Sequence, residues 1–197
     1  MSSTHVALIR GINVGRAKRV AMADLRALVA GLGYDDVRTL LNSGNVVFTV
    51  PSGARRSGDP AARIEEAMTA RLGFSARVTV LTAEEVAAAV RENPLRGVAD
   101  DPSRLLVAVL ADRVDAARLR PLLEQDWAPD RLAVAGGAGA RVAYIWCPGG
   151  VLASRLVAAF GRALGDAATT RNLTTMSKLA AIAAGPGPTK AARTRQS

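Results

Sequence analysis

Two polar, glycine-containing loops near the start of the chain carry the residues best suited to binding an anion. The first, Gly11 to Gly15, follows Arg10 and precedes Arg16, Lys18 and Arg19. Glycine lets backbone N–H groups turn toward an anion, and basic side chains near the next helix add positive charge. The second loop, Asn42 to Asn45, offers hydroxyl and amide donors. We therefore predict a site for a phosphate or carboxylate at Arg10, Gly11, Asn13, Gly15, Lys18, Asn42, Ser43 and Asn45.

Both loops also have a purely structural interpretation. The first has the spacing Gly-x-x-x-Gly-x-x-Lys, which matches neither a Walker loop nor the Gly-x-Gly-x-x-Gly dinucleotide turn. Gly11 and Gly15 can simply shape a connection that Asn13 caps, with the basic residues in solvent. All four residues of the second loop are ordinary hairpin formers. The loops are thus either a ligand site or a pair of turns.

A second group of donors is predicted in the later part of the chain. Thr169-Thr170-Arg171-Asn172 precedes the last helix, so Thr170 or Asn172 can cap it. Pro148-Gly149-Gly150 leads into another helix, whose first turn contains Ser154 and Arg155. Ordinary capping explains these residues. The alternative is a second anion site formed by Ser154, Arg155, Arg171 and Asn172.

Catalytic and metal-binding patterns are sparse. His5 is the only histidine and begins a strand, and Cys147 is the only cysteine and ends an apolar one. These counts exclude an internal disulfide and a Cys/His zinc cluster, and we read both residues as structural. Paired acids such as Glu65-Glu66 fall at predicted helix starts, on exposed helical faces or in loops, where charged residues are usual. The sequence predicts no catalytic residue, no metal and no cofactor.

The elements that must position the first site follow from hydrophobic periodicity and breakers. Strands are predicted at residues 6–10, 37–41, 46–50 and 76–81. Apolar residues recur at helical spacing from Met22, which predicts a first helix that ends at Gly33. A second helix is predicted to begin at Asp59-Pro60 and to end at Gly73. Thr82 and Glu85 have the spacing of a capping box, so a third helix runs to about Asn93. The order is βαββαβ plus a helix.

The second half repeats this order. Strands are predicted at residues 105–110, 132–135 and 142–147, with a short one near Ala168. A helix from Val114 is interrupted or delayed by Pro121. A further helix contains Leu152, Leu156 and Phe160, and the last contains Leu173, Met176 and Ile182. Residues 1–98 and 99–184 are therefore predicted as two halves, followed by a disordered basic tail at 185–197.

The βαββαβ order is that of the ferredoxin-like fold. We predict an α+β protein with two tandem ferredoxin-like halves and antiparallel sheets. In this topology the first and second strands run in the same direction with the third between them. The loop after Arg10 and the hairpin after Leu41 therefore emerge at the same end of the sheet.

Composition excludes several classes of protein. The 197 residues are 49% hydrophobic, which suffices for a packed core, and no apolar run is long enough to span a bilayer. No secretory leader is recognisable, so we expect a cytoplasmic protein without a membrane partner. The net charge of +9 suggests nucleic acid, yet Lys190, Arg193 and Arg195 in the tail contribute a third of it. Only 4% of residues are aromatic, so platforms for base stacking are scarce.

Several motifs resemble one protein family. Arg10 to Gly15, Met22 to Leu25 and Asn42 to Phe48 closely resemble blocks of the bacterial domain-of-unknown-function family 1697. Later blocks of the family are resembled by Asn93-Pro94-Leu95, by Tyr144 to Gly150 with the following Ser154-Arg155-Leu156, and by Thr169 to Ile182, so the resemblance covers about residues 5–184. It implies a compact, duplicated ferredoxin-like protein and supplies no activity, cofactor or catalytic residue.

Three functions remain open at this point. The first is binding of a phosphorylated small molecule, a nucleotide or a nucleic-acid end through Arg10, Asn13, Lys18, Ser43 and Asn45. The second is a metal-independent transferase or hydrolase that stabilises developing negative charge with those donors and Arg171. The third is non-specific nucleic-acid binding through the basic surface and tail.

Overall fold

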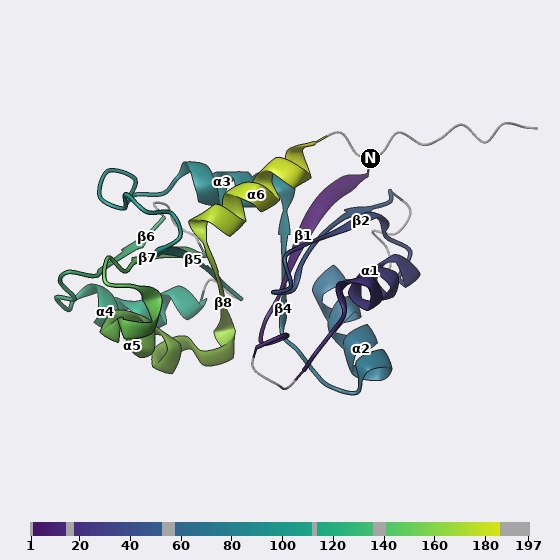
Figure 1. Ribbon diagram of the computed structural model, residues 1–197, viewed down its shortest axis with the longest axis horizontal. Helices are drawn as coiled ribbons and strands as arrows, with labels where there is room; N and C mark the ends of the chain where they lie inside the picture. Colours follow the sequence, from purple (N-terminus) through teal and green to yellow (C-terminus); the bar gives the residue numbers. More distant parts are fainter. Residues whose placement is uncertain (1, 15–17, 53–57, 112–113, 136–140, 186–197) are drawn as a thin grey trace, which may run out of the picture.

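The chain forms two four-stranded antiparallel sheets, each with its own helices (Figure 1). A computed structural model describes residues 2–14, 18–52, 58–111, 114–135 and 141–185. The first half comprises β1 (Ser3–Ile9), α1 (Met22–Gly31), β2 (Asp35–Leu40), β3 (Asn45–Val50), α2 (Pro60–Leu72), β4 (Val78–Thr82) and α3 (Ala83–Arg91). The second comprises β5 (Leu105–Leu110), the 3-10 helix η2 (Val114–Leu119), α4 (Arg120–Leu123), β6 (Arg131–Val134), β7 (Val142–Trp146), the 3-10 helix η3 (Val151–Ala153), α5 (Arg155–Leu164), the 3-10 helix η4 (Gly165–Ala167), β8 (Ala168–Asn172) and α6 (Leu173–Ala184).

The strand orders confirm the predicted fold class. The sheets have the orders β2-β3-β1-β4 and β6-β7-β5-β8, and every neighbouring pair is antiparallel. Each half is therefore a ferredoxin-like unit in which the first and second strands are parallel and flank the third. The division at residues 98 and 99 stays a prediction, and all of the predicted tail except Gly185 lies outside the described residues.

Local sequence signals account for several helix boundaries. Asp59 caps α2, since its side chain accepts a hydrogen bond from the Ala61 N–H, and Pro60 begins the helix. Thr82 and Glu85 form the predicted capping box at the start of α3. Gly73, with φ of 73°, ends α2 in the left-handed conformation.

One helix prediction in the second half is confirmed at its predicted break, and another needs correction. The helix predicted from Val114, interrupted or delayed by Pro121, is a 3-10 helix followed by the short α4, whose first turn contains Pro121. Leu152 was predicted to lie in the same helix as Leu156 and Phe160, but it lies in η3 and its side chain is fully exposed. The α-helix begins only at Arg155, where the Ser154 side chain accepts a hydrogen bond from the Val157 N–H.

Three hydrophobic clusters hold these layers together. One joins α1 and α2 to the first sheet, around Leu25, Phe48 and Ile64. Another joins α4 and α5 to the second sheet, around Leu122 and Phe160. The third contains residues of both halves, listed here by element: Val6 and Leu8 of β1, Val86 and Ala89 of α3, Val107 of β5, Tyr144 of β7, and Met176 and Leu179 of α6. The halves thus share a continuous core.

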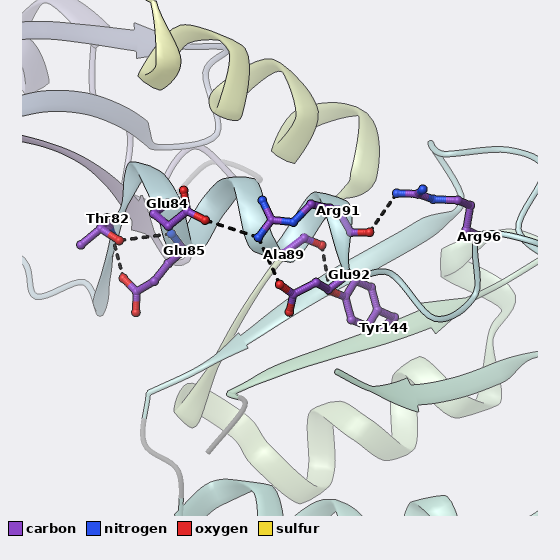
Figure 2. Close-up of polar contacts among 8 residues, drawn as sticks. All are labelled: Thr82, Glu84, Glu85, Ala89, Arg91, Glu92, Arg96 and Tyr144. Atoms are coloured by element: carbon purple, nitrogen blue, oxygen red, sulfur yellow. Dashed lines mark hydrogen bonds and ion pairs between the residues drawn. The ribbon is translucent and has the colours of Figure 1, made fainter. Parts of the chain in front are cut away.

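The helices that end the two halves, α3 and α6, pack against each other at this junction (Figure 1). Each also reaches the opposite half. Helix α6 contacts β1 and β3, and Tyr144 of β7 donates a hydrogen bond of 2.8 Å to the Ala89 carbonyl in α3 (Figure 2). On the outer side of α3, Arg91 pairs with Glu84 and Glu92. These surface pairs contribute little to stability compared with the shared core.

Replacing Tyr144 with phenylalanine tests the polar part of the junction. The hydroxyl is buried, and burial raises its pKa to about 12, with nearby Glu92 adding to the shift. It therefore remains a neutral donor at physiological pH. Losing this one hydrogen bond should lower the free energy of unfolding by about 1 kcal/mol. Urea denaturation measures the change, and an unaltered free energy of unfolding would show that this hydrogen bond does not stabilise the junction.

The inner edge strands of the two sheets, β4 and β8, meet between the halves. Thr79 and Thr169 contact through their hydroxyl groups at 3.1 Å. An arginine side chain donates a hydrogen bond to one carbonyl on each strand: Arg141 to Val80 O at 3.2 Å, and Arg10 to Ala168 O at 2.7 Å. Side-chain contacts rather than a backbone ladder thus join these two edges.

Within the described ranges, no helix has both the length and the apolar composition needed to cross a bilayer.

Candidate functional site

The turn after β1 and the β2-β3 hairpin lie side by side. The Ile9 N–H donates to Gly44 O at 2.8 Å, and Asn13 Nδ2 donates to Asn42 O at the same distance. Ile12, which is buried, also packs against Gly44. The two loops are therefore neighbours, as the topology predicted. Gly15 lies outside the described residues.

Asn13 uses its side chain to fix the first loop. Its Oδ1 accepts a hydrogen bond of 2.8 Å from the Val20 N–H, and its Nδ2 donates to Val20 O as well as to Asn42 O. The residue has φ of 57°, a left-handed conformation that asparagine tolerates better than most residues. Both amide donors and the acceptor are thus used within the protein. Asn13 shapes the loop rather than presenting a free donor.

The hairpin residues direct their polar groups toward the second half of the protein. Asn45 is fully buried, and its Nδ2 donates to Leu40 O and to Ser43 Oγ at 3.0 Å. Its Oδ1 accepts a hydrogen bond of 2.6 Å from Arg171 Nε. The Ser43 carbonyl accepts another from Arg171. This hairpin therefore serves as a docking point for Arg171.

Arg171 of β8 connects the halves through a set of neutral acceptors. Its Nη2 donates to Ile9 O at 2.7 Å and to Ser43 O at 2.9 Å, and its Nη1 donates to Thr170 O at 2.8 Å. Burial, together with the smaller effect of the neighbouring Arg10, lowers the pKa of the guanidinium to about 10. At neutral pH Arg171 is still a cation. Within the described part of the chain, no carboxylate pairs with it.

The four residues of the second predicted site do not converge on one ligand position. Arg171 points into the first half, whereas Asn172 caps α6 by accepting a hydrogen bond from the Thr175 N–H. Ser154 caps α5 and donates a hydrogen bond of 2.6 Å to Asp130 Oδ2. Arg155 is exposed in the first turn of α5. Helix capping accounts for Ser154 and Asn172.

Arg10 and Lys18 line an open cleft of about 730 Å³. Arg10 Nε donates to Asp166 Oδ1 at 3.0 Å, and its side chain is 35% exposed. Lys18 Nζ donates to Ser75 O at 2.9 Å and lies 5.8 Å from the centre of the Phe74 ring. Lys18 has φ of 51°, which is strained for a lysine. The loop thus holds this ammonium at the cleft at a cost in backbone energy.

The remaining walls come from α2, the segment before β4, and η4. They contribute Glu65, Glu66, Thr69, Ala70, Ser75, Ala76, Arg77 and Asp166, while Gly11 completes the first loop. Arg77 is a third cation, paired with Glu65 at 3.7 Å and 57% exposed. Glu65 also accepts a hydrogen bond of 2.7 Å from the Val78 N–H. Glu65 is therefore committed to supporting β4.

Arg77 was missed from the sequence, although the predicted topology contains the signal. The first and fourth strands of a ferredoxin-like unit are antiparallel neighbours, and Ile9 pairs with Val78 here. The residue after β1 must therefore lie beside the residue before β4. The Arg10 N–H accordingly donates to Arg77 O at 2.9 Å.

The single cysteine and the single histidine are both packed within the protein. Burial raises the pKa of the Cys147 thiol, which disfavours the reactive thiolate. His5 stacks on Phe48, with 5.8 Å between ring centres, and its Nδ1 lies 3.0 Å from Ser3 O. Among the described residues, no three His, Cys, Asp or Glu side chains cluster as metal ligands would.

These observations define an α+β protein of two ferredoxin-like halves with a charged cleft that is lined mainly by the first half and by Asp166 of the second. Residues 2–138 match the family described as "Protein of unknown function (DUF1697)", and the chain belongs to that family. Its fold is similar to the structure of the conserved bacterial protein SP0830 from Streptococcus pneumoniae, with a TM-score of 0.72 and 21% identity. The similarity covers 93% of this chain and 99% of that one. None of the curated proteins matches the chain.

Proposed function

We propose that this protein binds a phosphorylated or other anionic small molecule in the cleft beside the first sheet. The observation that carries the proposal is the gathering of Arg10, Lys18 and Arg77 around one open cavity. Arg10 and Lys18 come from the loop after β1 and Arg77 from the segment before β4, and each is held by contacts within the protein. A prearranged set of donors binds an anion without a large ordering cost.

The donors at the cleft have capacity left for a ligand. Lys18 shows one hydrogen bond from an ammonium that can donate three. Arg10 uses Nε and Nη1, and its partner Asp166 is 81% exposed. An ion pair this exposed contributes little, so a phosphate can compete with Asp166 for Arg10. The ligand contacts in this proposal are therefore Arg10, Lys18 and Arg77, with Asn13, Ser43 and Asn45 as the scaffold.

Substituting alanine for both Arg10 and Lys18 should weaken phosphate-ester binding by at least about thirtyfold, because two charge-assisted contacts are lost. Isothermal titration calorimetry with sn-glycerol 3-phosphate measures the dissociation constant. The ligand-induced rise in Tm should disappear in parallel. Circular dichroism must show that the variant keeps its fold, because Arg10 also contacts Ala168 in the second half.

A matched control removes one arginine and one lysine elsewhere. Arg162 of α5 and Lys178 of α6 are exposed, and their double alanine variant makes the same change in net charge. Its affinity should equal that of the unaltered protein. Equal weakening in both double variants would instead indicate attraction to the overall positive charge. In that case binding should also fall steeply with salt and after removal of residues 185–197, as expected for nucleic acid.

A further inference from the structure

We infer that the ligand of this cleft is a zwitterionic phosphate monoester, one that carries an ammonium group as well as the phosphate. The inference rests on the proposed function and specifies the class of ligand. It follows from the charges that share the cavity with Arg10, Lys18 and Arg77.

Among the described residues that line it, the cleft is balanced in charge rather than basic, with the three cations accompanied by three carboxylates, Glu65, Glu66 and Asp166. A site selected only for a polyanion gains nothing from carboxylates in its wall, since like charges repel the ligand. Carboxylates beside a phosphate site favour a ligand that brings its own positive charge.

The three carboxylates differ in what they already contact. Glu65 accepts from the Val78 N–H and pairs with Arg77, and Asp166 pairs with Arg10. Glu66 makes no hydrogen bond and no ion pair with any described residue. It is an exposed residue of α2 that lines the cavity. Glu66 is therefore the carboxylate free to receive an ammonium group.

The walls place the two kinds of charge on different elements. Arg10 and Lys18 belong to the loop after β1, whereas Glu66 lies on α2 with Thr69 and Ala70 on the same helical face. The small side chain of Ala70 leaves space along that face. A cavity of about 730 Å³ is much larger than inorganic phosphate requires, so it has room for an ester whose amine extends toward α2.

Two phosphate monoesters of similar size test the inference. O-phosphoethanolamine carries an ammonium group, and sn-glycerol 3-phosphate carries hydroxyl groups in its place. We expect the unaltered protein to bind phosphoethanolamine about three- to fivefold more tightly, the size of a partly exposed ion pair. In Glu66→Gln the two dissociation constants should become equal, with affinity for glycerol phosphate retained. Calorimetric titration gives both constants, and Glu124→Gln, which changes an exposed glutamate of the second half, should leave the preference intact.

The outcomes separate this inference from the proposed function. If neither ester binds the unaltered protein, the proposed function itself fails. If both bind with equal affinity, the cleft is an anion site and the inference that its ligand is a zwitterion is wrong. A preference for phosphoethanolamine that survives Glu66→Gln would also overturn the inference, because Glu66 would not be the ammonium's partner.

Discussion

Replacing Arg171 with methionine is expected to lower the free energy of unfolding by about 2–4 kcal/mol. The substitution keeps an unbranched side chain as far as the position of Nε but removes every donor. It leaves Asn45 Oδ1, Ile9 O and Ser43 O without the hydrogen bonds that they accept from Arg171. Unsatisfied acceptors cost about 1–3 kcal/mol each. Because the variant no longer buries a charge without a carboxylate partner, it regains part of this loss. Urea denaturation followed by circular dichroism measures the change.

Two further variants separate the hydrogen bonds from the charge. Arg171→Lys keeps the charge but lacks the planar fork that reaches Asn45 and Ile9 together, so it should recover only part of the loss. Arg162→Met removes an exposed arginine from α5 and should change stability by less than about 0.5 kcal/mol. If Arg171→Met were as stable as Arg162→Met, Arg171 would not be a structural link between the halves.

The fold was predictable because its signals are local. Leu105–Leu110 is a continuous apolar run and forms β5 over the predicted residues. Asp59-Pro60 and the Thr82/Glu85 pair mark helix starts that depend on neighbours one turn away. Leu152 shows the limit of this reasoning. It has helical spacing to Leu156, yet the chain forms a 3-10 turn and Ser154 starts the α-helix after it.

The site was predictable only in part, since a side chain's partners can lie far along the sequence. The topology correctly placed the loop of Arg10 and Lys18 beside the hairpin. The predicted topology did not indicate that the Asn45 side chain would accept a hydrogen bond from Arg171, which is 126 residues away. Whether an asparagine or arginine is free for a ligand depends on such distant acceptors. The sequence offers the residue types, and tertiary packing decides which donors remain available.

Gly44→Ala is expected to lower the free energy of unfolding by about 2–4 kcal/mol, the sum of a backbone and a packing cost. Gly44 has φ of 76°, a left-handed conformation that alanine adopts only with strain. A Cβ there would lie 2.8 Å from Ile12 Cδ1 and 3.0 Å from Ile9 Cβ, which is closer than packed carbon atoms allow. Because Ile9 and Ile12 are fully packed, neither can move away cheaply. Chemical denaturation of the purified variant gives the value.

Gly73→Ala isolates the backbone part of that cost. Its φ of 73° nearly equals that of Gly44, but no atom lies within 4 Å of an added Cβ. It should therefore cost only about 1 kcal/mol. A double-mutant cycle with Ile12→Ala then tests the clash: removing the Ile12 side chain should make Gly44→Ala at least about 1 kcal/mol less harmful than in the unaltered background. Strictly additive effects, or equal losses at Gly44 and Gly73, would show that the close approach of the hairpin to Ile12 carries no strain.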